Sequence, residues 1–199
     1  MSTARRACAQ ARRHMDGASA VEQALVNALL FRYQSDQPAA DMQAWNTAYA
    51  NKMRTLHRQF GDDPDVAAHF VEALMNRSPW KMWDLHSGQP ADGADTEECL
   101  DVLADSMGRV RAAGLPPHPG LWHLYLHLME MSPVPEQALT CGDELRNLVP
   151  DAGHLVHMPT HIDVQCGNYR DVVDSNHATT CSRPVSAARP CRRPRLSSP

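Results

Sequence analysis

Two stretches of this 199-residue chain decide its fold: residues 119–130, PGLWHLYLHLME, and residues 153–163, GHLVHMPTHID. Each carries two histidines four residues apart, His123 with His127 and His157 with His161. This spacing places both imidazoles of a pair on one face of a helix. The second pair follows the first at an offset of 34 residues. The match therefore predicts an internal repeat with two equivalent helices.

A period of 34 residues is that of tetratricopeptide (TPR) repeats, in which each unit is a helix–turn–helix. With units starting at residues 119 and 153, four residues fall where such repeats favour their type: Ala138, Pro150, Gly167 and Tyr169. The clearest repeats are therefore predicted at 119–152 and 153–178. Their helices are expected at about 119–132, 135–149, 152–166 and 169–178.

The earlier part of the chain also has helical periodicity. Apolar residues from Met42 to Phe60 recur every three or four positions, and no long stretch alternates with the period of a strand. Residues 77–94 form a loop, and Trp80 and Trp83 predict that it folds back on the body. We predict an all-α fold over residues 17–178, a TPR-like right-handed stack of about eight helices.

The two ends differ from the body in charge. Residues 1–14 hold four arginines and no acid, and residues 179–199 hold five, whereas residues 15–178 hold 10 basic and 23 acidic residues. We expect a disordered leader over 1–16 and a disordered Arg/Pro/Ser-rich tail over 179–199. The acidic body argues against specific nucleic-acid binding.

The expected location is cytoplasmic. No apolar run reaches the roughly 18 residues of a membrane span, and the N-terminus lacks the apolar core of a signal peptide. The six cysteines form no CxxC pair, which favours a reducing compartment over a disulfide framework.

The histidines predict a metal site. His123, His127, His157 and His161 should face one another across neighbouring helices, and His154 and Glu130 extend the same faces. Imidazoles with a carboxylate suit Zn, Fe(II), Cu or Mn. Glu130 or Glu72 would then serve as a ligand or a general base. The pairs could instead be copied repeat sequence that binds no metal.

Pro159 leaves the geometry of the second pair open. It lies between His157 and His161 and lacks the backbone N–H of a helix interior. It either kinks one continuous helix or begins a new helix. In the second case His157 would lie outside that helix.

Several segments resemble a family of TPR-domain proteins found in bacteria and fungi. They include residues 49–54 (YANKMR), 62–67 (DDPDVA), 72–75 (EALM), 118–120 (HPG), 123–127 (HLYLH) and 153–162 (GHLVHMPTHI). The resemblance covers about residues 18–178 and implies a helical-repeat fold. The family's recurring residues are all present: Glu72, His123, His127, Glu130, His154, His157 and His161. This set favours a ligand or chemical site over a peptide-binding groove.

Family members usually have further repeats upstream and continue as helix beyond the position of residue 178. This chain is therefore expected to be a truncated member that self-associates through uncapped repeats.

The leading functional hypothesis is a divalent metal or small ligand in a His-lined concave pocket, with a metalloenzyme as one form of it. Trp80 and Trp83 would either wall that pocket or pack in the core. The alternative is a non-catalytic scaffold that holds a protein partner in the groove. The third reading is a truncated, non-functional product.

Overall fold

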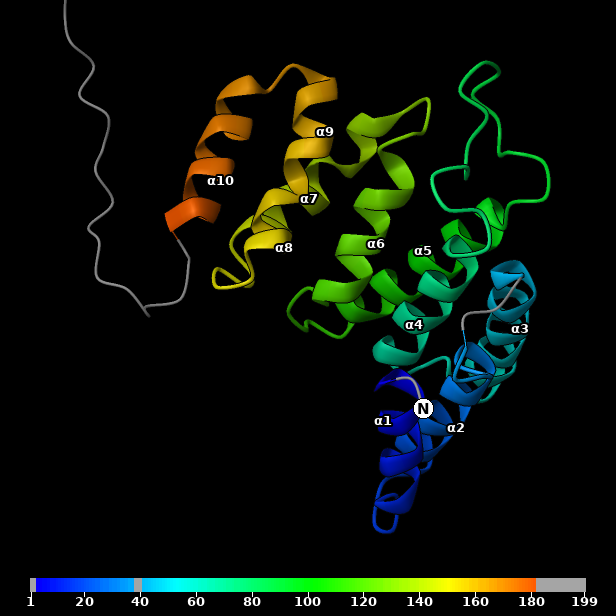
Figure 1. Ribbon diagram of the computed structural model, residues 1–199. Coiled ribbons are helices and arrows are strands. Elements are labelled where there is room, and N and C mark those ends of the chain that lie inside the picture. The colour runs from blue at the N-terminus through cyan, green and yellow to red at the C-terminus, as the bar shows by residue number, and fades with distance from the viewer. Residues whose placement is uncertain (1–2, 38–40, 182–199) are drawn as a thin grey trace, which may run out of the picture.

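The computed structural model describes residues 3–37 and 41–181, and these residues form an all-helical protein (Figure 1). Within the described ranges, the extended pairing is an isolated antiparallel bridge between Trp83 and Pro90. The all-α prediction is confirmed. The described chain has more helical segments than the eight predicted, because its N-terminal residues form a helix and because Pro159 divides another.

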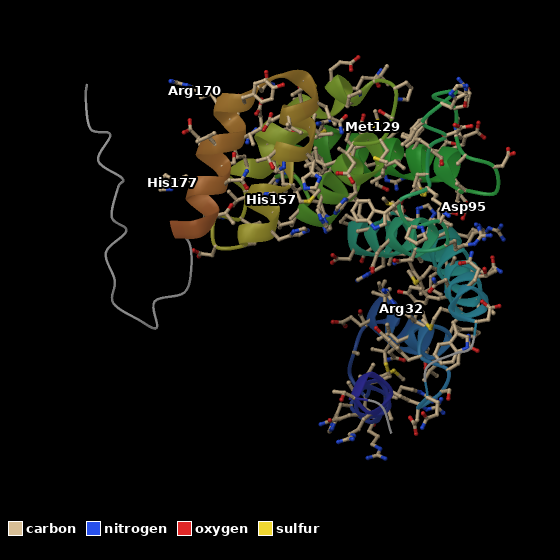
Figure 2. The ribbon with its side chains drawn as sticks, turned by 45° about the horizontal axis from the view of Figure 1, so that its top comes forward. Arg32, Asp95, Met129, His157, Arg170 and His177 are labelled. Carbon is tan, nitrogen blue, oxygen red and sulfur yellow. The ribbon has the colours of Figure 1, made fainter. Side chains whose placement is uncertain are left out.

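Three helices form the N-terminal part: α1 (Thr3–Arg13), α2 (Ala20–Arg32) and α3 (Met42–Phe60). Figure 2 shows them projecting at an angle from the later helices. The expectation of a disordered leader is corrected by α1. Residues 4–11 are mostly good helix formers, and the helix buries Cys8 while it packs on α2. Ser19 and Glu22 start α2 with reciprocal capping hydrogen bonds.

The core continues through α4 (Pro64–Met75) and α5 (Thr96–Ala112). Asp63 caps the first N–H groups of α4, and Phe70 and Leu74 are buried within it. The loop between these helices folds back as predicted, since the Trp83 indole N–H donates to the Leu128 carbonyl at 2.7 Å. This bond ties the loop to the helix that follows α5 in the chain, α6 (Pro119–Met129).

The C-terminal part follows the predicted helical segments closely. It comprises α6 (Pro119–Met129), the 3-10 helix η1 (Pro135–Ala138), α7 (Leu139–Arg146), α8 (Gly153–His157), α9 (Pro159–Cys166) and α10 (Tyr169–Cys181). Helix α10 runs three residues beyond the expected boundary at 178. The rest of the predicted tail, residues 182–199, lies outside the described residues.

Pro159 begins α9, so the second of the two readings of this position is correct. The linking residue Met158 keeps helical dihedrals, with φ −53° and ψ −39°. His157, the last residue of α8, therefore stays beside His161 despite the break. Gly142 lets α7 approach this point, because an added Cβ would lie 3.3 Å from the Cβ of Pro159.

A candidate histidine metal site

The start of α6 fixes where its histidines lie. His118 accepts a hydrogen bond from the Leu121 N–H through Nδ1, at 3.2 Å, and its Nε2 lies 3.1 Å from Asp65 of α4. Because Nδ1 accepts, Nε2 carries the proton and donates to the carboxylate. Pro119 supplies the preset backbone of the first helical position. The helix N-terminus is thereby tied to α4.

Three histidines converge between α6 and α8. His123, His127 and His154 each offer one nitrogen, and the three nitrogens lie within 4.8 Å of one another. The Nε2 atoms of His123 and His154 are 3.0 Å apart. Two nitrogens on a tetrahedral ion with bonds near 2.0–2.1 Å stand about 3.3 Å apart. Small side-chain rotations would therefore let these three histidines hold a metal ion.

The electrostatics of this group favour the neutral imidazole that a metal requires. Burial, followed by the neighbouring His127 and His154, lowers the pKa of His123 to about 4. Burial and the nearby histidines His127, His157 and His161 also lower the pKa of His154. Both rings therefore lose their proton at a lower pH than free imidazole does, which favours the neutral form near neutral pH.

The other two predicted ligands form a pair of their own. The Nε2 atoms of His157 and His161 lie 3.1 Å apart. The Nδ1 atom of His157 is 2.7 Å from Oδ1 of Asn176, and the Nδ1 atom of His161 is 2.6 Å from Oε2 of Glu130. Each ring is thus fixed through its Nδ1 atom, while its Nε2 atom faces the other histidine of the pair.

Glu130 lies between the two histidine groups. Its Oε1 is 3.5 Å from the Nδ1 of His127, and its Oε2 contacts His161. Burial raises the pKa of this carboxyl, which is only 5 % exposed, but the hydrogen bonds and charges of the two histidines outweigh burial and lower it. Such a carboxylate orients imidazoles and strengthens them as ligands. The geometry gives Glu130 a positioning role.

Glu72 belongs to a different set of contacts. Its carboxylate pairs with Arg32 at 3.0 Å and with His69 at 3.7 Å. The His69 hydrogen bond first, and then Arg32, lower its pKa to about 2 against the opposing effect of burial. A carboxylate with so low a pKa is a weak general base near neutral pH. It reaches the site only as part of a pocket wall.

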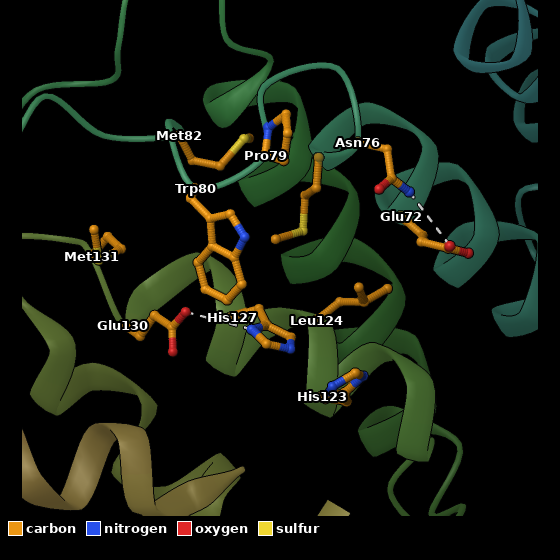
Figure 3. Close-up of a pocket in the computed structure, with 11 residues that line it drawn as sticks. Glu72, Asn76, Pro79, Trp80, Met82, His123, Leu124, His127, Glu130 and Met131 are labelled. Carbon is orange, nitrogen blue, oxygen red and sulfur yellow. Dashed lines mark hydrogen bonds and ion pairs between the residues drawn. The ribbon is translucent and has the colours of Figure 1, made fainter. Parts of the chain in front are cut away.

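That pocket opens beside the histidines and has a volume of about 260 Å³. Its lining is Glu72, Met75, Asn76, Pro79, Trp80, Met82, His123, Leu124, His127, Glu130 and Met131. In Figure 3 the Trp80 ring lies above His127, and a dashed line marks the contact between His127 and Glu130. Trp80 is 68 % exposed, has a φ of 61°, and meets the His127 ring edge-on at 5.9 Å between centroids. It lines the pocket, whereas Trp83 packs against the core.

The structure brings the predicted site residues to one region but groups them differently. The four imidazoles of His123, His127, His157 and His161 were expected to form one set. Instead His154 joins the two from α6, and His157 and His161 stand as a pair. Sequence reasoning missed Asn176. An Asn at that position has no motif around it, so only the packing of α10 on α8 reveals its role.

Comparisons with protein-family models, with curated proteins and with solved structures find nothing that matches this chain. The candidate site is therefore assigned from the arrangement of its side chains alone. In the residues that the structure describes, none of the helices combines the length and apolar character of a membrane span. Four cysteines in these ranges, Cys8, Cys99, Cys141 and Cys166, are free thiols.

Proposed function

We propose that this protein binds a divalent transition metal ion through His123, His127 and His154. The observation that carries the proposal is the approach of their three nitrogens to within 4.8 Å of one another. Three imidazoles suit Zn, Fe(II), Cu or Mn, and they leave a coordination position for water or a ligand. The lowered pKa of His123 supports this reading, because a protonated ring cannot bind a metal.

The adjoining pocket supports a small-molecule ligand next to that ion. Met75, Met82 and Leu124 give it an apolar wall, while His123 and His127 belong to both the pocket and the metal group. An ion with an open position activates water or polarises a bound carbonyl. The proposed activity is therefore that of a metalloenzyme acting on a small substrate that packs against Trp80.

We further propose that α6 to α10 form two TPR-like units in a right-handed stack whose concave face carries the histidines. The order of helices over 119–181 supports this, and so does the distance of 6.3 Å between the ring centroids of His127 and His161. These two residues occupy equivalent positions at the offset of 34. A cytoplasmic location remains part of the proposal.

Equilibrium dialysis against Zn²⁺ tests the metal site. We expect the wild-type chain to retain zinc, and H123Q and H154Q each to weaken binding at this site. The exposed His86, which lies on the loop between α4 and α5 and belongs to neither histidine group, provides the matched control H86Q, which should bind like wild type. At a free zinc concentration 100 times Kd, binding should stabilise the fold by about 2.7 kcal/mol in thermal or urea unfolding. Unchanged zinc binding in the H123Q/H154Q double variant would overturn the proposal.

A non-catalytic scaffold is the second candidate. The exposed Trp80 and the partly exposed Met75 and Met131 are typical of surfaces that accept protein segments. Two variants separate the functions, since a scaffold would lose its partner in W80A and keep it in H123Q/H154Q, whereas a metal-dependent function would be lost in H123Q/H154Q.

A further inference from the structure

The hydrogen bonds behind His157 and His161 determine which of their nitrogens carry protons. The side-chain N–H of Asn176 donates to the Val172 carbonyl at 2.9 Å, which turns its amide oxygen toward His157. That oxygen can only accept, so the Nδ1 of His157 is the donor. Glu130 is a carboxylate and also only accepts, so the Nδ1 of His161 is a donor as well.

When both rings are neutral, each therefore presents an Nε2 lone pair to the other at 3.1 Å. Two lone pairs at this distance repel unless a cation lies near both. The separation is close to the roughly 3.3 Å between two nitrogens bound to one tetrahedral ion. Metal-binding histidines characteristically donate their other N–H to a carboxylate or carbonyl group, which is the arrangement behind both of these rings.

We infer that His157 and His161 bind a second divalent transition metal ion through their Nε2 atoms, so that the histidine cluster is a two-metal centre. Asn176 and Glu130 fix the two rings. Two protein ligands leave several coordination positions for water or for a substrate oxygen. Glu130 touches one ring of each group, His127 and His161, and lies between the two sites. The second site depends on its own pair of ligands and does not require the first.

Zinc stoichiometry tests this inference. We expect two equivalents of Zn²⁺ per wild-type chain after dialysis, one in H157Q/H161Q and one in H123Q/H154Q. The control H86Q should keep two. Far-UV circular dichroism checks that each variant is folded.

This experiment can overturn the first metal site and the second metal site independently of each other. Two equivalents in a folded H157Q/H161Q variant would overturn the second site. So would a single wild-type equivalent that only H123Q/H154Q removes, because the pair would then hold a shared proton instead of an ion. A single wild-type equivalent that only H157Q/H161Q removes would overturn the first site and support the second.

Asn176 offers a test that leaves every ligand in place. In N176L the acceptor behind His157 is lost, and we expect zinc affinity at the second site to fall by about 10–100-fold while the first site still binds its ion. N176D keeps an acceptor and should retain the wild-type affinity. Equal second-site affinity in N176L, N176D and wild type would overturn the role of this hydrogen bond and the metal site built on it.

Discussion

The ion pair between Arg146 and Asp163 joins the end of α7 to α9, two residues beyond His161. The Arg146 guanidinium is 3.0 Å from the Asp163 carboxylate and also donates to the Ser175 hydroxyl of α10. The Asp163 side chain is only 3 % exposed, and that of Arg146 is 17 % exposed. We predict that R146M destabilises the fold, because it leaves a buried carboxylate without its counter-charge.

Removing one partner of a buried ion pair costs about 3–5 kcal/mol. Since Arg146 is partly accessible, water would solvate some of the charge left behind, and the expected loss is near the lower end, about 3 kcal/mol. With a urea m-value of about 2 kcal/mol/M, the unfolding midpoint should fall by about 1.5 M. Urea titration followed by circular dichroism measures this shift.

Two further variants serve as controls for R146M. R170M removes an exposed arginine of α10 and should change stability by no more than about 0.5 kcal/mol. R146M/D163L replaces the whole pair with apolar side chains and should recover most of the lost stability. If the free energy of unfolding of R146M lies within about 0.5 kcal/mol of the wild-type value, the pair is not a desolvated contact and the reasoning is wrong.

Three other predictions follow from the described contacts. E130Q should weaken zinc binding about 10–100-fold in a chelator competition assay, and an unchanged affinity would refute its positioning role. Glu72 has a folded pKa of about 2 against an ordinary value of 4.5, so its contribution to the free energy of unfolding is present above pH 4.5 and lost as the pH falls toward 2. Because this side chain is 37 % exposed, we expect its contribution to the free energy of unfolding to be only about 1 kcal/mol. In urea unfolding at a series of pH values, acid should therefore destabilise E72Q less than it destabilises wild type. G167A should cost about 1–2 kcal/mol in thermal unfolding because Gly167 has a φ of 81°, whereas G108A, in open space on α5, should stabilise by about 0.5–1 kcal/mol; the reverse order would refute the argument.

Apolar periodicity and helix-breaking residues predicted most of the helices. Apolar spacing together with the breaks at Pro64 and Pro119 placed α3, α4 and α6 within a few residues of their observed bounds. The sequence did not predict the N-terminal helix, because four arginines and no acid in residues 1–14 are typical of a disordered leader. Its other residues favour a helix, and Cys8 gains burial only after α2 is in place.

The sequence predicted that the site histidines lie close together but not how they are grouped. An offset of 34 residues identifies equivalent positions, but it does not specify how far one helix is rotated against the next. In the structure a new helix begins at Pro159, and Gly142 of α7 packs closely against it. There His154 contacts His123 of α6, while His157 contacts Asn176 of α10.

The position of Glu130 couples the two proposed ions thermodynamically. An ion on His161 makes its Nδ1–H a stronger acid and draws the shared carboxylate toward that ring, away from His127. The first site then loses part of the negative charge that favours its own ion, and the two cations also repel each other. Occupancy should therefore be negatively cooperative, and by reciprocity the first ion weakens the second by the same factor. Such a centre would hold one ion tightly and exchange the other readily.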